Sequence, residues 1–149
     1  MAYDNPQRET YHQASSAFGA TTESSQYYGP KGKVGYVRDI DVYITATMVG
    51  TTTVPEICVG SSQGDASYAR FRLGTAAGTG YAATAPFRAS KVGGFTLEDG
   101  TPVYEDYTGH VKMATAVIPA DTAFFISRVA GTGGSPAGTG TSRVIIDWR

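Results

Sequence analysis

Apolar and polar positions alternate with a period of two residues from Val34 onward. The clearest stretch has apolar side chains at every second position: Ile40, Val42, Ile44, Ala46 and Met48. Alternation of this kind is typical of a β-strand that turns one face to a core and the other to solvent. We therefore predict a long, half-buried strand over residues 40–48.

The same pattern, interrupted by Gly-, Pro- and Ser-rich turns, predicts further strands along the chain. We expect weaker or short strands near 56–59, 68–73, 81–89, 95–97 and 103–107, and clear strands at 110–118, 123–130 and 142–148. No stretch has helical periodicity. The predicted fold class is therefore all-β, as a single β-sandwich or jelly-roll-like domain. The predicted core comprises Ile40, Val42, Ile44, Phe71, Leu73, Val111, Met113, Phe125, Val144 and Ile146.

Composition strengthens the all-β prediction. The 149 residues include only 2 Leu, against 12 Val, 7 Ile, 19 Thr and 10 Tyr. β-Branched and aromatic side chains suit a pleated surface, whereas Leu is the usual residue of helix cores. The 19 Gly residues indicate many tight turns.

Residues 1–33 differ from the rest of the chain, because they are polar and carry almost no aliphatic side chains. Five aromatic residues are scattered through this segment: Tyr3, Tyr11, Phe18, Tyr27 and Tyr28. We predict that residues 1–33 form an extended N-terminal arm and residues 34–149 the β-sandwich domain. The aromatic residues suggest that the arm lies on a surface of its own domain, a sister subunit or another protein. A partly disordered terminus is the alternative.

Net charge limits the classes of partner, and cysteine usage limits the covalent chemistry of the chain. The formal net charge of −1 provides no general attraction to nucleic acid or to an anionic membrane. We expect neither partner, and the polar N-terminus without an apolar run predicts synthesis in the cytoplasm without a secretory signal. Cys58 is the only cysteine, so no intrachain disulfide is expected. Its apolar neighbours predict a buried, unreactive thiol.

No constellation of residues predicts catalysis, a cofactor or a metal. The glycine-rich run 131–140 lacks the Lys and the helix of a phosphate-binding loop. One Cys and the two distant residues His12 and His110 cannot close a zinc site. Asp39 and Asp41 are expected on the wet outer face of one strand, about 7 Å apart, where a polar sandwich face explains them better than glycoside hydrolysis. We therefore expect a protein that is not an enzyme.

An acidic stretch leaves one metal question open. It contains Glu98, Asp99, Glu105 and Asp106, which are hard oxygen ligands suited to Ca²⁺. Their spacing matches no known calcium loop, and solvated acidic turns are common. No metal site is therefore predicted there, and calcium binding stays an open question.

A third group of side chains is a candidate interface. Tyr68, Arg70 and Arg72 have the same parity in a predicted strand and are expected on its outer face. Tyr and Arg are enriched at protein interfaces, although an ordinary solvated face explains them equally well. Together with the five aromatic residues of the arm, they are the interface candidates of this chain.

The C-terminal third carries a resemblance to a known class of proteins. Its residues are Val117-Ile-Pro-Ala-Asp-Thr122, the strand 123–129, a Gly/Thr/Ser/Pro loop and Val144-Ile-Ile-Asp-Trp148. With the polar arm and the Leu-poor body, the chain resembles tailed-bacteriophage virion proteins, most closely the capsid decoration or cementing type. The resemblance is one of general sequence character over most of the chain and includes no diagnostic motif. No family site residue is therefore carried over.

The resemblance implies a function. Decoration proteins bind the outside of an assembled head as oligomers, commonly trimers, so it implies a non-enzymatic homo-oligomer on the capsid surface of the virion whose partner is the major capsid protein. The alternative is a tail or fibre component with a receptor- or carbohydrate-binding role. If the arm serves assembly, deleting residues 1–28 is expected to leave the fold intact and to weaken oligomerisation or shell binding.

Overall fold

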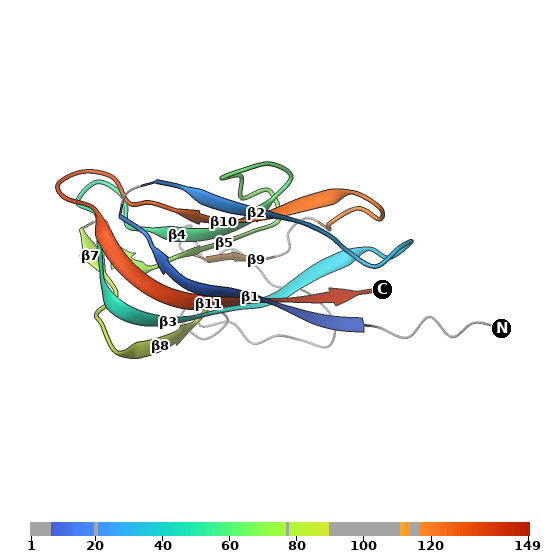
Figure 1. Ribbon diagram of the computed structural model, residues 1–149, viewed down its shortest axis with the longest axis horizontal. Coiled ribbons are helices and arrows are strands. Elements are labelled where there is room, and N and C mark those ends of the chain that lie inside the picture. Colours follow the sequence, from blue (N-terminus) through green and yellow to red (C-terminus); the bar gives the residue numbers. More distant parts are fainter. Residues whose placement is uncertain (1–6, 20, 77, 90–110, 114–116) are drawn as a thin grey trace.

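The computed structural model describes residues 7–19, 21–76, 78–89, 111–113 and 117–149, and its elements are β-strands in two packed antiparallel sheets (Figure 1). The four-stranded sheet has the order β1 (Gln7–Ala17), β11 (Ala137–Trp148), β3 (Gly35–Val49) and β8 (Ala85–Arg88). The five-stranded sheet has the order β2 (Glu23–Tyr28), β10 (Ala123–Val129), β4 (Glu56–Gly60), β5 (Ala69–Arg72) and β9 (Val111–Met113). A small ribbon pairs β6 (Gly74–Ala76) with β7 (Thr79–Gly80). The all-β prediction is confirmed, and the jelly-roll-like connectivity stays a prediction.

The core lies between the two sheets, where alternate side chains of each strand meet. Seven predicted core residues are buried: Ile40, Val42, Ile44, Phe71, Leu73, Val144 and Ile146. Phe125 was predicted wrongly, because Phe124 and Ile126 point inward and leave Phe125 only half-buried. The side chains of Val111 and Met113 lie outside the described residues. Cys58 is fully buried, as predicted.

The segment predicted as an arm is part of both sheets. β1 pairs with β11 from Gln7↔Trp148 to Ala17↔Thr139, and β2 pairs with β10 from Ala123↔Tyr28 to Arg128↔Glu23. The boundary at residue 33 therefore does not separate an arm from a sandwich. A polar segment can do this because the ladder uses backbone N–H and C=O groups, which every residue here supplies.

Trp148 packs against residues on both sides of the junction between these N-terminal strands and the rest of the fold. Its indole ring is fully enclosed, lies against the backbone of Gly29 and Gly35, and has its centroid 5.6 Å from that of Phe124. A Cβ atom on Gly35 would come within 2.6 Å of the ring, so this position requires glycine. The indole N–H donates a hydrogen bond of 3.2 Å to the Tyr11 hydroxyl. One side chain of β11 thus contacts residues of both sheets.

Parts of the sequence analysis fall outside the described residues. The strands predicted at 95–97 and 103–107 and the acidic stretch from Glu98 to Asp106 all lie there. Among the residues that are described, no helix is long and apolar enough to cross a membrane.

Candidate functional site

A row of charged side chains crosses the outer face of the four-stranded sheet. The strand registers align His12 with Arg143, Arg143 with Asp41, and Asp41 with Arg88, so all four strands contribute one residue. The neighbours of these residues along the strands, such as Val42 and Val144, point into the core, which places the row on the outside. We call these four residues the charged row.

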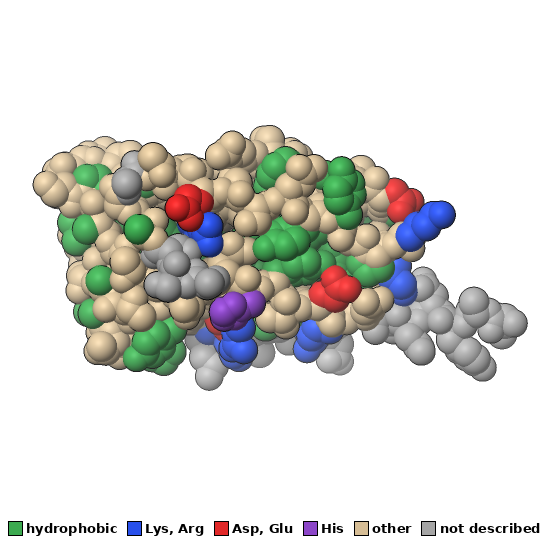
Figure 2. Space-filling model, viewed as in Figure 1, with side chains coloured by type: hydrophobic (Ala, Val, Ile, Leu, Met, Phe, Trp, Pro, Cys, Tyr) green, Lys and Arg blue, Asp and Glu red, His purple; other side chains and the backbone are tan. Residues whose placement is uncertain are grey.

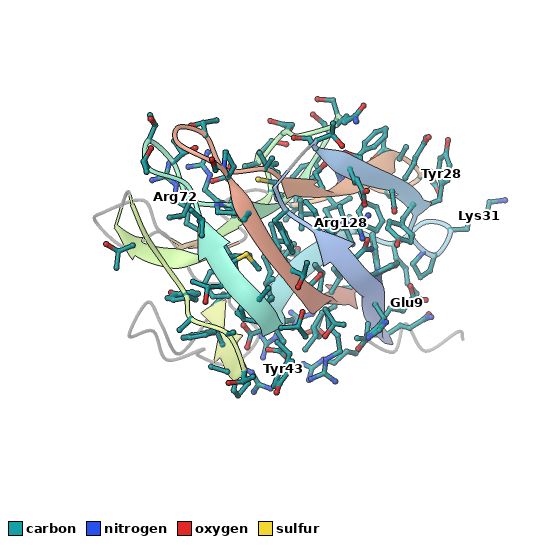
Figure 3. The ribbon with its side chains drawn as sticks, turned by 60° about the vertical axis from the view of Figure 1, so that its left-hand side comes forward. Glu9, Tyr28, Lys31, Tyr43, Arg72 and Arg128 are labelled. Atoms are coloured by element: carbon teal, nitrogen blue, oxygen red, sulfur yellow. The ribbon has the colours of Figure 1, made fainter. Side chains whose placement is uncertain are left out.

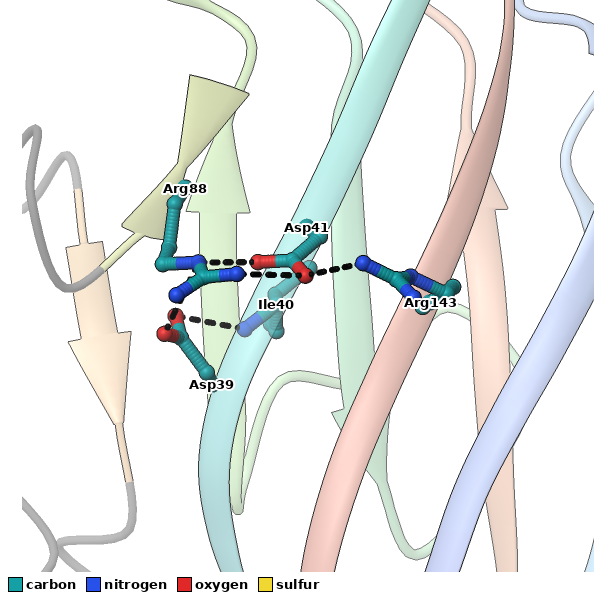
Figure 4. Close-up of polar contacts among 5 residues, drawn as sticks. All are labelled: Asp39, Ile40, Asp41, Arg88 and Arg143. Atoms are coloured by element: carbon teal, nitrogen blue, oxygen red, sulfur yellow. Dashed lines mark hydrogen bonds and ion pairs between the residues drawn. The ribbon is translucent and has the colours of Figure 1, made fainter. Parts of the chain in front are cut away.

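Asp41 is the centre of the charged row (Figure 4). It accepts hydrogen bonds from Arg88 Nε at 2.8 Å and Arg88 Nη2 at 3.3 Å, and from Arg143 Nη2 at 2.9 Å. Asp39 lies 3.6 Å from Arg88 Nε and also accepts a hydrogen bond of 2.9 Å from the backbone N–H of Ile40. The hydrogen bond to Asp41 raises the pKa of Arg88 above its ordinary value. Two guanidinium groups are therefore held in fixed orientations.

The burial of these groups corrects one prediction. Asp39 and Asp41 were expected on a wet face, but their side chains are only 8% and 13% exposed. Arg88 contacts both carboxylates and Arg143 contacts Asp41, and the side chains of these arginines are 46% and 52% exposed. The surface consequently presents hydrogen-bond donors to solvent and keeps the carboxylate acceptors underneath.

A second row runs beside the first, two residues further along the strands. Thr141 is aligned with Tyr43, and Tyr43 with Pro86. Tyr43 is 46% exposed, one of the few exposed large hydrophobic residues among those described. We call Thr141, Tyr43 and Pro86 the Tyr43 row. Strand geometry places it about 7 Å from the charged row on the same face.

The two rows line one groove. It has a volume of about 890 Å³, which lies within the range of small-molecule binding sites. Its walls are the charged row and the Tyr43 row. Val42, Phe87 and Ser142, which lie between the residues of the two rows in β3, β8 and β11, complete the lining. The groove combines a flat apolar surface with fixed polar groups, which is the composition of a binding site.

The rest of this sheet face holds a second ion-pair cluster. Asp147 forms ion pairs with Arg8 Nε at 2.7 Å and with Arg38 Nε at 3.1 Å, and its side chain is 8% exposed. The hydrogen bond to Asp147 raises the pKa of Arg8. This cluster repeats the arrangement around Asp41, in which a covered carboxylate joins two arginines.

The nucleophilic and metal-ligating groups do not converge on the groove. Burial raises the pKa of the Cys58 thiol above its ordinary value, which keeps it protonated. Within the described ranges, no three His, Cys, Asp or Glu side chains gather in a way that could hold a metal ion. What the described lining does offer is hydrogen-bond donors on Arg88 and Arg143 and the exposed ring of Tyr43.

A second surface is formed by the edge strands β1 and β2, which lie on the same side of the sandwich (Figure 1). Among the described residues, each pairs on one side only, β1 with β11 and β2 with β10. Figure 2 shows hydrophobic side chains gathered in the middle of this side. Both strands therefore have a row of backbone groups available for pairing.

The space between these two edges is closed by side chains, which we call the β1–β2 seam: Tyr11, Gln13, Tyr27 and Arg128. Tyr11 and Tyr27 pack edge to face with centroids 4.9 Å apart, and both rings also contact Phe124. Gln13 donates to the Tyr27 hydroxyl at 2.7 Å and accepts from Arg128 Nη1 at 2.9 Å. The seam holds the two edges in a fixed relation.

The predicted interface residues occupy different places. Figure 3 labels Tyr28 and Arg72, which lie in different strands of the five-stranded sheet. Tyr28 is 68% exposed, whereas Phe18 is fully buried in the core. Tyr11 and Tyr27 are half-buried in the seam, and Tyr3 lies outside the described residues.

Tyr68, Arg70 and Arg72 do not form one outer surface. Tyr68 is buried and packs on the core, because β5 begins only at Ala69 and the strand alternation does not extend back to it. Arg70 and Arg72 lie on the surface and both pair with Glu56, at 3.7 and 3.4 Å. The prediction for Tyr68 was wrong, and the two arginines are partly exposed.

The sequence analysis missed the groove. Its residues do share a parity within each strand, such as Asp41 with Tyr43, Pro86 with Arg88 and Thr141 with Arg143. That signal identifies residues on a common face of one strand. It does not identify which strands are neighbours, and this register brings the residues together.

Comparison of the chain with protein-family models, with curated proteins and with solved structures finds no match.

Proposed function

We propose that this chain is a non-enzymatic viral structural protein that binds the outer surface of a phage capsid and stabilises the assembled head. The observation that supports the proposal is the pair of open edge strands, β1 and β2, on one side of the sandwich. The exposed Tyr28 lies at the end of β2 and adds contact area at low entropic cost. The resemblance of the sequence to decoration proteins supplies the identity of the partner.

Open edges suit assembly by strand addition. A strand of a neighbouring chain can pair with an open edge through backbone hydrogen bonds, and side chains then give specificity. Natural proteins usually protect such edges with Pro, Lys or bulges. β1 and β2 contain no Pro or Lys, and the bulge in β1 between Gln13 and Ser16 leaves residues 7–13 regular. In this proposal the edges contact the major capsid protein or sister copies in a homo-oligomer, commonly a trimer in proteins of this type.

Binding alone is sufficient for stabilisation. A protein that binds only the assembled shell shifts the equilibrium by about 2.7 kcal/mol per site at a hundredfold excess over its Kd. Many copies on a symmetric shell multiply this effect. No chemical step is required.

The test uses virions that carry or lack the protein, together with edge variants. Thr10→Lys on β1 and Gln26→Lys on β2 each place a charge beside an open edge, and Ser62→Lys, in the exposed loop after β4, is the matched control. We expect virions with the native protein or the control variant to release DNA at a higher temperature than virions without it. The edge variants should bind the shell more weakly.

Two results would contradict the proposal. One is an equal release temperature with and without the protein; the other is its absence from the head surface in electron micrographs. The second candidate function, a tail or fibre component that binds a receptor or carbohydrate, is favoured by the groove on the four-stranded sheet. Location on the tail in the same micrographs would select it.

A further inference from the structure

We infer that the groove on the outer face of the four-stranded sheet is a binding site for an acidic oligosaccharide, with Arg143 and Arg88 holding its carboxylate and hydroxyl oxygens and Tyr43 stacking on a sugar ring. The inference rests on the groove alone. It goes beyond the proposed head-binding role, which uses β1 and β2, and it gives the second candidate function a specific site.

The polarity of the groove selects a ligand rich in acceptor oxygens. Asp41 lies beneath the two arginines, so the groups that reach solvent are the guanidinium donors. Arg143 uses only Nη2 in its contact with Asp41, and its Nε and Nη1 have no partner among the described residues. A planar guanidinium with free N–H groups is well suited to a carboxylate. No acceptor among the described residues competes with a ligand carboxylate for Nε and Nη1 of Arg143.

The Tyr43 row selects a flat, partly apolar ligand. Tyr43 and Pro86 are direct cross-strand neighbours and form a continuous surface beside the charged row. The spacing of about 7 Å between the rows allows one ring to lie on Tyr43 while its substituents reach the arginines. A pyranose ring has this combination, because its C–H face is apolar and its edges carry hydroxyl groups.

The modest charge of the groove argues against a polyphosphate ligand. Among the described residues, its lining contains one acidic residue, Asp41, two arginines and His12. Asp39 sits against Arg88 from below and offsets part of this charge. Binding of nucleic acid depends on many Lys and Arg contacts to phosphate. The described lining of the groove supplies two arginines, and Arg8 and Arg38 elsewhere on this face are paired with Asp147. The remaining donor atoms of Arg143, Nε and Nη1, match a ligand with isolated carboxylates.

The test is isothermal titration of the full chain with a panel of uronate oligosaccharides: oligogalacturonate, oligomannuronate and hyaluronan fragments. A malto-oligosaccharide of matched length tests for neutral sugars, and a short single-stranded oligonucleotide tests for phosphate polyanions. We expect at least one uronate to bind and the other two ligands to bind at least about tenfold more weakly.

Two pairs of variants locate the site. Arg143→Gln and Tyr43→Ala should each weaken uronate binding by about tenfold. Arg72→Gln and Tyr28→Ala are matched controls on the other sheet, and they should leave it unchanged. Arg143→Lys keeps the charge but loses the planar donors, and should also weaken binding. Far-ultraviolet circular dichroism establishes that each variant is folded.

Several outcomes would overturn the inference. These are absence of uronate binding by the native chain, equal binding of the neutral sugar, tighter binding of the oligonucleotide, or equal losses in the control variants. None of these results changes the expected shell binding of Thr10→Lys or Gln26→Lys. The head-binding proposal can thus fail or survive independently of this one.

Discussion

The charged row and the β1–β2 seam each connect neighbouring strands through side chains, but the interactions differ in kind. The charged row joins β3, β8 and β11 through a covered carboxylate and two half-exposed arginines. The seam joins the two sheets through packed aromatic rings near Trp148 and through hydrogen bonds of Gln13 with Tyr27 and Arg128. Ion pairs near solvent contribute little to stability, whereas buried aromatic rings contribute much.

This difference separates stability from recognition. The side chains of the seam are half-buried or buried and are bonded to one another, so its role is to hold β1 and β2 in place. The charged row adds less to stability but presents oriented donors on the surface. Substitutions in the two regions should therefore have opposite profiles: seam variants should affect unfolding, and row variants should affect binding.

The largest effect on stability is expected from deletion of residues 1–28, which removes β1 and β2 and with them the seam. The sequence analysis predicted that this deletion leaves the fold intact, but the structure assigns β1 and β2 to the two sheets. Removal would expose the pairing edges of β11 and β10 and uncover Phe124. We now expect loss of cooperative unfolding, measured by circular dichroism against temperature. A truncated chain with a sharp native transition would show that the seam is dispensable.

Trp148→Ala tests the seam at one side chain. The ring is fully buried between Gly29 and Gly35, so its removal leaves a large cavity. We expect the free energy of unfolding to fall by about 3–5 kcal/mol, measured by denaturant titration. Tyr28→Ala, at an exposed position, should change it by less than about 0.5 kcal/mol. Similar losses in both variants would contradict the assignment of the core.

Asp41→Asn tests the charged row. The substitution removes the shared carboxylate but leaves arginines that solvent can reach, so the loss should be smaller, about 1–2 kcal/mol. A double-mutant cycle with Arg143→Gln should give a coupling energy of at least about 0.5 kcal/mol. Strict additivity would mean that the contact of 2.9 Å contributes nothing to stability.

The smallest expected effect is a loss of stability at alkaline pH, and it arises in the seam. Burial, reinforced by the hydrogen bond to Glu9, raises the pKa of Tyr11 above its ordinary value of 10.0. The folded state therefore favours the neutral phenol, so this contribution to stability is complete below pH 10 and is lost as the pH rises further. We expect denaturant midpoints to fall above pH 10. Tyr11→Phe should reduce that fall, and an unchanged pH profile would exclude Tyr11 as its source.

The strands with aliphatic alternation were predictable, and those without it were not. Residues 40–48 form most of β3 because Ile40, Val42 and Ile44 give a clear period of two. β1 and β2 have no such signal, since polar residues occupy most positions and only Tyr11 and Tyr27 supply inward apolar area. Their pairing partners lie far along the chain, where local pattern carries no information. In β10, two consecutive Phe residues left the inward parity ambiguous.

The candidate site could not be predicted for a related reason. Asp41 was predicted on the outer face, but its burial depends on Arg88 and Arg143, which lie 47 and 102 positions further along the chain. A strand pattern assigns a face, whereas only the register across strands assigns neighbours. The exposure of Tyr43 follows from the same register.

The position of β11 between β1 and β3 has a consequence for the rate of folding. Arg8 and Asp147, which join β1 to β11, are 139 positions apart, so the four-stranded sheet cannot form from hairpins of neighbouring segments alone. Pairing of β1 with β11 closes a loop that contains most of the chain. The entropic cost of closing this loop is offset only when most of the chain is already ordered. Refolding should therefore be slow for a chain of this size, on the order of milliseconds to seconds, and β1 should pair late. Until then, the edge of β11 is exposed to other chains, which makes high concentration during refolding a route to misassembly.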